Sequence, residues 1–407
     1  MSNFKMQPVR GTRDIYGVEC EKFNAIVNKA RILSDLYNFS EISLPIFEFS
    51  DIFHRTLGQT SDVVSKETYT FLDRDGTSIT LRPEFTAGIV RSVIHSGLTQ
   101  SMPIKYFSYG PVFRHERPQK ARYRQFHQIN FESLGNAEVT NDIELLMLAE
   151  DLLKALGLRS GVLLEISSLG SAESRIEYSK SLVDYLMKYE ADLSADSKVR
   201  MHKNPIRILD SKDAQDRRIL EEAPSIFSTF DAESRSRFDA LQAGLDEMNI
   251  AYTINPQLVR GLDYYTHTVF EYTTTQLGSQ ATVLAGGRYD GLFSLMGGDH
   301  VPGIGFAAGI ERLAELITED HIAPKTKLVA LIPIGDMAVR SIPTISQKLR
   351  LQGYRVDYII HHNTRKQMQK ANKMQADYVL VFGEDELRTQ SFKMKDMLTG
   401  AEELITL

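Results

Sequence analysis

Strand-like sequence lies on both sides of a long segment that lacks it. Alternation of apolar and polar residues, which is typical of strands, continues to about residue 168 and resumes at Tyr252. Between residues 175 and 250 the sequence is charged and rich in helical patterns instead. Because strands return after this segment, the pattern predicts one sheet domain in two parts, 1–174 and 251–318, separated by a helical insertion of residues 175–250.

The remaining pattern predicts which elements surround that sheet. Before the insertion we expect strands at 42–47, 68–72, 78–81, 104–110, 125–133 and 162–168, and helices at 22–39, 86–97 and 142–156. After it we expect strands from 252 to 283 and at 303–307, and a helix at 309–317. A polar stretch, 318–327, reads as a linker. Beyond it strands (328–334, 354–360, 378–382) alternate with helices (336–351, 364–374), which indicates a separate α/β domain of residues 327–407.

Composition excludes several classes of protein. At 407 residues the chain exceeds one ordinary core, and its single cysteine excludes a disulfide framework and fits a reducing cytosol. It has no apolar run long enough to span a membrane and no signal-peptide core, so we expect a cytoplasmic protein without a membrane partner. The Walker and dinucleotide glycine motifs are also missing from the sequence.

A basic loop between two expected strands is the first candidate site. Residues 112–125 hold five Lys or Arg and one Glu, a local charge of +4 within a chain of net charge −6. A solvated loop is one reading, but Arg114, Arg122 and Arg124 suit phosphate oxygens. Along the next strand Gln128, Asn130 and Glu132 share one face. Three polar residues on one face need water or a ligand, which favours phosphate or nucleotide binding.

Three weaker signals accompany this loop. Glu84 and Thr86 stand at a helix start, where they could simply cap it. The stretch 259–272 reads as a strand with Arg260 and Asp263 at its entrance. Glycine-rich segments at 285–292 and 303–313, the second carrying Arg312, either serve turn geometry and tight strand–helix packing or let the backbone approach a ligand.

Taken together, these segments resemble the histidyl-tRNA synthetase family, which is a class II aminoacyl-tRNA synthetase family. The three class II motifs look like 22–47, 106–132 and 303–313, and the histidine-specific motifs look like 258–265 and 285–290. The resemblance implies an α+β fold: an antiparallel sheet flanked by helices, a helical insertion and a C-terminal α/β anticodon-binding domain. It also implies a homodimer.

Residue roles follow from the same resemblance. Histidine and ATP, with Mg²⁺, would give histidyl-adenylate and pyrophosphate, and histidine would then pass to the 3′ end of its tRNA. Arg260 and Arg114 match the catalytic arginines. The residues matching the ATP site are Arg114, Glu116, Phe126 and Arg312, and those matching the histidine site are Glu84, Thr86, Gln128, Glu132, Arg260, Tyr265 and Tyr289. No protein metal ligand is expected.

The resemblance also points to tRNA contacts. Gln119 and Arg124 lie in the loop expected to reach the acceptor end, and Arg365 and Lys373 share a helix face that is either a tRNA contact or a solvated surface. Asp263 is expected to orient Arg260 or Tyr265.

One alternative belongs to a different class of protein. It is the non-catalytic synthetase paralogue that regulates ATP phosphoribosyltransferase in histidine biosynthesis. That paralogue typically lacks the anticodon-binding domain and loses catalytic motif residues, whereas Arg114, Arg260, Tyr265 and Arg312 are present here. A synthetase for another amino acid is disfavoured by the motif at 258–265.

Overall fold

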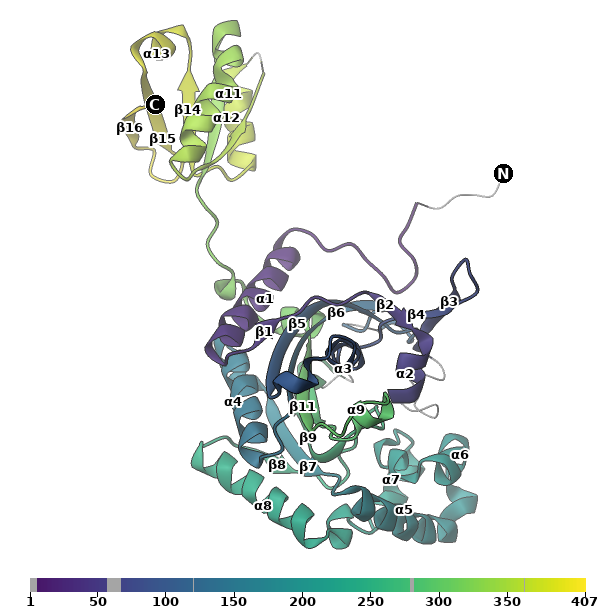
Figure 1. Cartoon of the computed structure of the whole chain (residues 1–407). Coiled ribbons are helices and arrows are strands. Elements are labelled where there is room, and N and C mark those ends of the chain that lie inside the picture. The colour runs from purple at the N-terminus through teal and green to yellow at the C-terminus, as the bar shows by residue number, and fades with distance from the viewer. Residues whose placement is uncertain (1–5, 57–66, 120, 279–281, 362) are drawn as a thin grey trace, which may run out of the picture. The chain divides into compact units, whose positions relative to one another are not determined.

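A computed structural model describes residues 6–56, 67–119, 121–278, 282–361 and 363–407 of the chain. The chain divides into two compact units, Met1–Ile322 and Ala323–Leu407. The fold class expected from the sequence is confirmed: the first unit is built on a large, mostly antiparallel sheet flanked by helices (Figure 1).

The large sheet has the strand order β1-β5-β6-β11-β10-β9-β7-β8. Its strands are β1 (Ser40–Glu41), β5 (Ile104–Phe113), β6 (Gln125–Leu134), β7 (Leu163–Ser168), β8 (Thr253–Ile254), β9 (Thr266–Thr273), β10 (Thr282–Arg288) and β11 (Gly303–Gly309). A small second sheet, β2-β4-β3, consists of β2 (Phe47–Phe49), β3 (Tyr69–Leu72) and β4 (Ser78–Leu81). The expected hairpin at 68–81 is therefore confirmed as β3 and β4.

Each face of the large sheet packs on its own set of helices. One face, which includes Ile129 and Phe131, forms a core with α1 (Val18–Leu36), α4 (Val139–Ala155), α8 (Ala232–Glu247) and α10 (Ile310–Leu316). The other core includes α2 (Ser50–Thr56), α3 (Thr86–His95) and α9 (Leu292–Leu295). In Figure 1, α3 lies within the curve of the sheet and α4 lies outside it. Because side chains alternate along β6, its apolar residues Ile129 and Phe131 pack in the first core, and its polar residues face the side of the sheet that carries α3.

The segment expected as an insertion is helical. The helices α5 (Ala172–Leu186), α6 (Ala195–Lys203) and α7 (Ala214–Leu220) and the short 3₁₀ turns η4 (Met187–Asp192), η5 (Pro205–Asp210) and η6 (Ile226–Thr229) pack together. We call residues 172–229 the helical bundle. The last helix of the segment, α8, packs instead on α4, β7 and β9.

The second unit is a five-stranded sheet with the order β13-β12-β14-β15-β16. The predicted alternation is confirmed in β12 (Leu328–Pro333), α11 (Asp336–Leu351), β13 (Arg355–Tyr358), α12 (Thr364–Lys373) and β14 (Tyr378–Phe382). Sequence analysis missed α13 (Glu384–Thr389) and the antiparallel strands β15 (Ser391–Asp396) and β16 (Glu402–Thr406).

Two strand predictions were wrong. Residues 42–46 form no strand, because the chain there passes from the large sheet to the small one. The carbonyls of Leu44 and Pro45 accept hydrogen bonds from the Arg82 side chain rather than from a neighbouring strand. The predicted strand at 259–272 begins only at Thr266, so Arg260 lies in a loop.

Candidate active site

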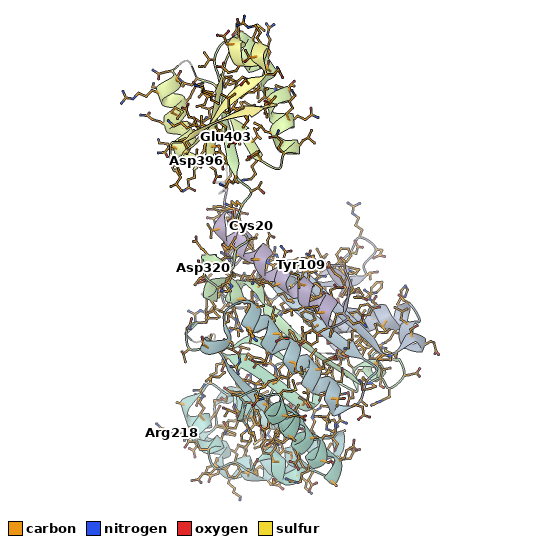
Figure 2. All side chains as sticks on the ribbon, turned by 90° about the vertical axis from the view of Figure 1, so that its left-hand side faces the viewer. Cys20, Tyr109, Arg218, Asp320, Asp396 and Glu403 are labelled. Carbon is orange, nitrogen blue, oxygen red and sulfur yellow. The ribbon has the colours of Figure 1, made fainter. Side chains whose placement is uncertain are left out.

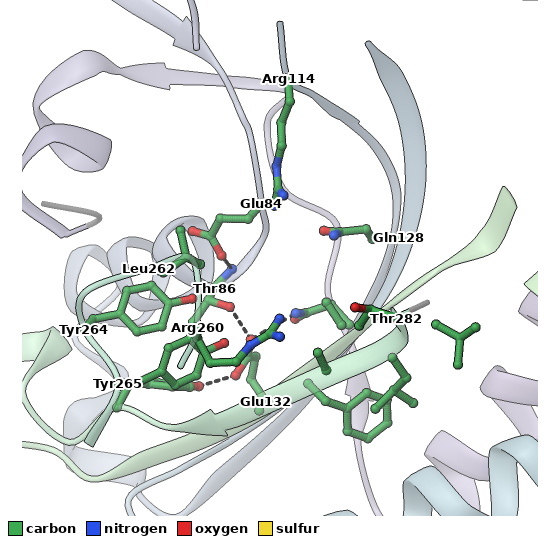
Figure 3. A pocket seen from close by; sticks show the side chains of 18 residues that line it. Glu84, Thr86, Arg114, Gln128, Glu132, Arg260, Leu262, Tyr264, Tyr265 and Thr282 are labelled. Carbon is green, nitrogen blue, oxygen red and sulfur yellow. Dashed lines mark hydrogen bonds between the residues drawn. The ribbon is translucent and has the colours of Figure 1, made fainter. Parts of the chain in front are cut away.

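A polar cavity opens on the face of the large sheet that carries α3 (Figure 3). Its walls come from the β4–α3 junction, from β6, from the loop before β9, and from β10 and β11. The residues lining it are Glu84, Thr86, Arg114, Gln128, Asn130, Glu132, Arg260, Leu262, Tyr264, Tyr265, Thr282, Val283, Leu284, Ala285, Tyr289, Gly305, Phe306 and Ala307. Every residue that the sequence suggested for histidine binding therefore lies at this one cavity.

Glu132 is a buried carboxylate at the centre of this cavity. It accepts hydrogen bonds from the hydroxyls of Thr86 (2.5 Å) and Tyr289 and from the Asn130 amide (3.0 Å). Burial and, to a smaller extent, the nearby Glu84 carboxylate outweigh the lowering effect of those hydrogen bonds, and together these effects raise the pKa of Glu132 to about 7. The site therefore stabilises a positive charge placed beside Glu132.

Glu84 is the second buried carboxylate. Its oxygens accept hydrogen bonds from the backbone N–H groups of Thr86 (2.6 Å) and Ala87 (2.8 Å) at the start of α3. The capping interpretation is thus correct for Glu84, whereas the Thr86 hydroxyl donates to Glu132. Burial raises the pKa of Glu84, and Arg114 partly offsets that effect.

Two buried acceptors on β6 have no partner in the described part of the chain. Gln128 Oε1 and Asn130 Oδ1 make no hydrogen bond to any of the described residues. An unpaired buried polar atom costs about 1–3 kcal/mol. Because both residues line the cavity, a ligand with N–H donors would remove that cost.

A second hollow adjoins the first along β6. It is lined by Arg114, Glu116, Ala121, Arg122, Tyr123, Phe126, Gln128, Gly309, Glu311 and Arg312. All residues that the sequence suggested for ATP lie here, and Arg114 and Gln128 line both hollows. The two sites therefore meet at Arg114.

The arginines of the second hollow are partly buried. The Arg114 guanidinium lies 5.5 Å from the centre of the Phe126 ring, and its Nε donates to the Pro83 carbonyl. Burial lowers the pKa of Arg114, and it lowers the pKa of Arg312 to about 10 with a contribution from Arg122. Partly buried guanidiniums that lower one another's pKa favour an anion between them.

Arg260 reaches the first cavity from the loop before β9. Its Nη1 donates to Glu271 Oε2 at 2.6 Å, and its buried Nε has no partner among the described residues. Glu271 also accepts a hydrogen bond from the Thr282 hydroxyl. One nitrogen of the guanidinium is thus anchored while another remains available to a ligand.

The suggested tRNA residues fall in both units. The backbones of Gln119 and Arg122 exchange two hydrogen bonds, and Arg124 Nε donates to the Glu116 carbonyl at 3.3 Å. Arg365 and Lys373 are exposed on α12. Neither pair lies in the first cavity.

Sequence reasoning missed several lining residues. Tyr264 neighbours the predicted Tyr265, so its motif could have found it. Leu262 and Thr282 gave no local signal, because the fold of the loop and the pairing of β9 with β10 bring them to the cavity. Glu271 does not line the cavity, but it binds two residues that do, Arg260 and Thr282.

No group of three His, Cys, Asp or Glu side chains in the described ranges could hold a metal ion. Nor does any helix in the described part of the chain have the length and apolar character to cross a membrane.

Comparison with known proteins bears on this site. Residues 11–313 match the family model described as histidyl-tRNA synthetase, and 328–407 match an anticodon binding domain. A Wolbachia pipientis (strain wPip) protein named histidine–tRNA ligase is 49% identical over 399 residues, covering 98% of this chain and 97% of its own. The crystal structure of apo S. aureus histidyl-tRNA synthetase is 34% identical, with a TM-score of 0.82 over 99% of this chain and 97% of that one.

A further solved structure is described as an ATP phosphoribosyltransferase regulatory subunit/histidyl-tRNA synthetase from Bacillus halodurans C. It is 20% identical, with a TM-score of 0.67 over 94% of this chain and 99% of that one, and so shares the fold. The family match over most of the chain and the near-complete coverage of a 49% identical relative agree with the geometry of the cavity, and the chain belongs to the histidyl-tRNA synthetase family.

Proposed function

We propose that this chain is a histidine–tRNA ligase, which activates L-histidine with ATP and transfers it to tRNA. The observation that carries the proposal is the meeting of two sites at Arg114. One hollow has buried carboxylates and unpaired acceptors, and the adjoining one has partly buried arginines and an aromatic face. A cationic amino acid and an anionic nucleotide would be neighbours there.

The first cavity suits histidine chemically. The substrate ammonium would bind beside Glu84 and Glu132, whose burial cost it offsets. The imidazole carries an N–H donor and an acceptor in its neutral form, which Gln128, Tyr264 and Tyr265 could satisfy. A site built to hydrogen-bond a polar ring rejects apolar analogues by roughly 10⁴–10⁵.

The second hollow suits ATP. Adenine would stack on Phe126, with Arg312 on its other side, and Glu116 is placed to accept from the adenine amine although it also pairs with Arg122. Arg114 would hold the α-phosphate at the junction.

Activation then requires two anions to approach. A carboxylate oxygen of histidine attacks the α-phosphorus, a P–O bond forms, and the bond to pyrophosphate breaks. Arg114 and Arg260 would offset the repulsion and stabilise the charge that develops on the phosphoryl oxygens.

Magnesium would need oxygen ligands from the nucleotide. Since the described residues contain no cluster of three suitable ligands, Mg²⁺ would enter on the ATP phosphates and depend on their oxygens.

Transfer would use other surfaces. We assign Gln119 and Arg124 to the acceptor end of tRNA, the helical bundle to the acceptor arm, and Arg365 and Lys373 to the anticodon region. A cytoplasmic location follows from these substrates.

A homodimer is part of the same proposal. Ile32 and Leu36 on α1 are 62% and 73% exposed, and Tyr109 on β5 (Figure 2) is 39% exposed. Arg31 also lies against Tyr109, with a 3.1 Å hydrogen bond to its hydroxyl. This apolar strip belongs to the segments that match the first two class II motifs, so a second copy is its expected partner.

The test is histidine charging of unfractionated bacterial tRNA by the purified chain. We expect labelled histidine, but not labelled glutamine, to become attached to tRNA when ATP is present. A folded chain that charges no tRNA would instead support the regulatory paralogue.

A further inference from the structure

The loop that carries Arg260 is held by side chains of the helical bundle. We propose that Arg207, Asn204 and Arg175 are positioning residues, through which the bundle sets the geometry of histidine activation. The proposal rests on the proposed function and adds a control element to it. The bundle would then do more than contact tRNA, because its placement would decide whether Arg260 and Tyr265 are correctly placed.

The loop needs external support. Residues 259–265 belong to no helix or strand, yet they supply Arg260, Leu262, Tyr264 and Tyr265 to the first cavity. Catalytic geometry has to be kept within about 0.5 Å, and loops keep it only when neighbouring groups lock them. The carbonyl groups of this loop are where such locks are found.

Arg207 in η5 holds the Arg260 end of the loop. Its Nη1 donates to the Arg260 carbonyl at 2.6 Å, and its Nη2 donates to the Gly261 carbonyl at 2.9 Å. Its Nε lies 3.8 Å from Asp263 Oδ1. One guanidinium therefore spans consecutive peptide groups, which a lysine ammonium cannot do in the same way.

Asp263 links that end to the middle of the loop. Its Oδ1 accepts a hydrogen bond from Asn204 Nδ2 at 2.9 Å, and Asn204 directly follows α6. We therefore infer that Asp263 helps to orient its neighbours in the loop through its hydrogen bond to Asn204 of the bundle.

Arg175 in α5 holds the other end. Its Nη1 donates to the Tyr265 carbonyl at 2.8 Å, and its Nη2 lies 3.5 Å from the Asp263 carbonyl. The two arginines thus hold different ends of one loop, one beside the proposed phosphate contact and one beside the proposed histidine contact.

The bundle can transmit a displacement because it is internally tied. Asp216 is buried and accepts hydrogen bonds from the hydroxyls of Ser194, Ser197 and Ser211, which join α6, α7 and the segment between them. Asn204 directly follows α6, and Arg207 lies in η5, which comes next in the chain. A shift of this part of the bundle would move both contacts together.

Because Arg207 and Arg175 hold different ends of the loop, their variants should have different kinetic effects, which a general loss of folded protein would not produce. ATP–pyrophosphate exchange, which needs no tRNA, is measured for Arg207→Ala, Arg207→Lys and Arg175→Ala, each with its melting temperature. Arg207→Ala should lower kcat by about 10–100-fold, with Arg207→Lys in between, because a charged hydrogen-bonding group is lost. Arg175→Ala should mainly raise the KM for histidine, by about tenfold.

Arg218→Ala is the matched control. Arg218 is an exposed arginine on α7 of the same bundle (Figure 2), and its removal should change neither parameter.

Two outcomes would overturn the inference. Folded Arg207 and Arg175 variants could keep exchange parameters within about threefold of the wild type. Alternatively, both variants could lose kcat in proportion to the fraction of each variant that is folded, and the KM for histidine could stay unchanged in both. If Arg207→Ala does not fold, Arg207→Lys decides, since wild-type kinetics in that variant would equally reject the role. Failure of the proposed function is distinct, because the wild type itself would then show no histidine-dependent exchange.

Discussion

At the scale of the residue, the Glu132 carboxylate loses its hydration when it is buried, and a bound cation would offset that desolvation energy. It is buried beside Glu84, and three neutral donors do not compensate for the loss of water. Its raised pKa means that the ligand-free fold binds a proton at Glu132 more tightly than the unfolded chain does. The stability that this carboxyl contributes is therefore complete below its unfolded pKa of about 4.5 and is lost as the pH rises through about 7.

Glu132→Gln should remove this dependence. Between about pH 5 and about pH 8, the free energy of unfolding of the wild type should fall relative to that of the variant by about 2 kcal/mol. Chemical denaturation of the ligand-free protein at both pH values measures the difference. Parallel pH profiles for the two proteins would show that Glu132 is ionised normally in the fold.

Arg260→Ala tests the neighbouring charge. Loss of one preorganised donor to a developing oxyanion costs about 10²–10³ in rate, so histidyl-adenylate formation should fall by that factor. Histidine binding, measured by calorimetry, should change little because Glu84, Glu132 and the tyrosines remain. Arg388→Ala, which removes an exposed ion pair in the second unit, is the control. Normal adenylate formation by Arg260→Ala would show that its catalytic role is misassigned.

Part of this site is visible in the sequence and part is not. Gln128, Asn130 and Glu132 could be placed on one face because strand alternation has a fixed period of two. Glu271 could not be predicted as the partner of Arg260, because the loop fold brings them together across 11 positions. The raised pKa of Glu132 likewise depends on burial, which a local pattern does not give.

At the scale of the element, the register of β6 and β11 forms the cavity floor. Gly305 pairs with Glu132, and a Cβ at Gly305 would collide with the Glu132 carboxyl and the backbone of Phe131. Gly305 is therefore required by close packing within the protein, against the Glu132 side chain, and not by a turn.

Gly305→Ala should displace the Glu132 side chain. We expect the KM for histidine to rise by about tenfold or more, because a charge-assisted contact is lost. Gly291→Ala is the matched control, since a Cβ there meets no atom within 4 Å. An unchanged histidine KM for Gly305→Ala would mean that Glu132 does not bind the substrate.

Element prediction failed where tertiary contacts replace strand pairing. The loop at 259–265 has the composition of a strand, but its carbonyl groups accept hydrogen bonds from the side chains of Arg175 and Arg207 instead of from a neighbouring strand. Strand β15 was missed although Phe392 and Met394 alternate inward, because six residues give a weak pattern between charged neighbours. Long periodic elements such as α11 and β6 were predicted within a few residues.

At the scale of the whole molecule, the described residues that line both hollows all belong to the first unit. The second unit has cores of its own on both faces of its sheet. Binding of the amino acid and ATP should therefore be separable from recognition of distant parts of tRNA.

A chain ending at Ile322 should keep ATP–pyrophosphate exchange within about threefold of the full chain and lose tRNA charging by about tenfold or more, since phosphate contacts supply much of nucleic-acid affinity. Arg365→Ala combined with Lys373→Ala in the full chain should show the same direction. Full charging by the shortened chain would show that the second unit is not needed for tRNA recognition.

Histidine and ATP are proposed to react where the two hollows meet, at Arg114. Histidine-dependent ATP–pyrophosphate exchange by the purified wild-type chain tests this most directly, with glutamine, asparagine and phenylalanine in parallel. We predict exchange with histidine and background rates with the other three amino acids. Background exchange with histidine, from a folded chain supplied with ATP and Mg²⁺, would contradict the account.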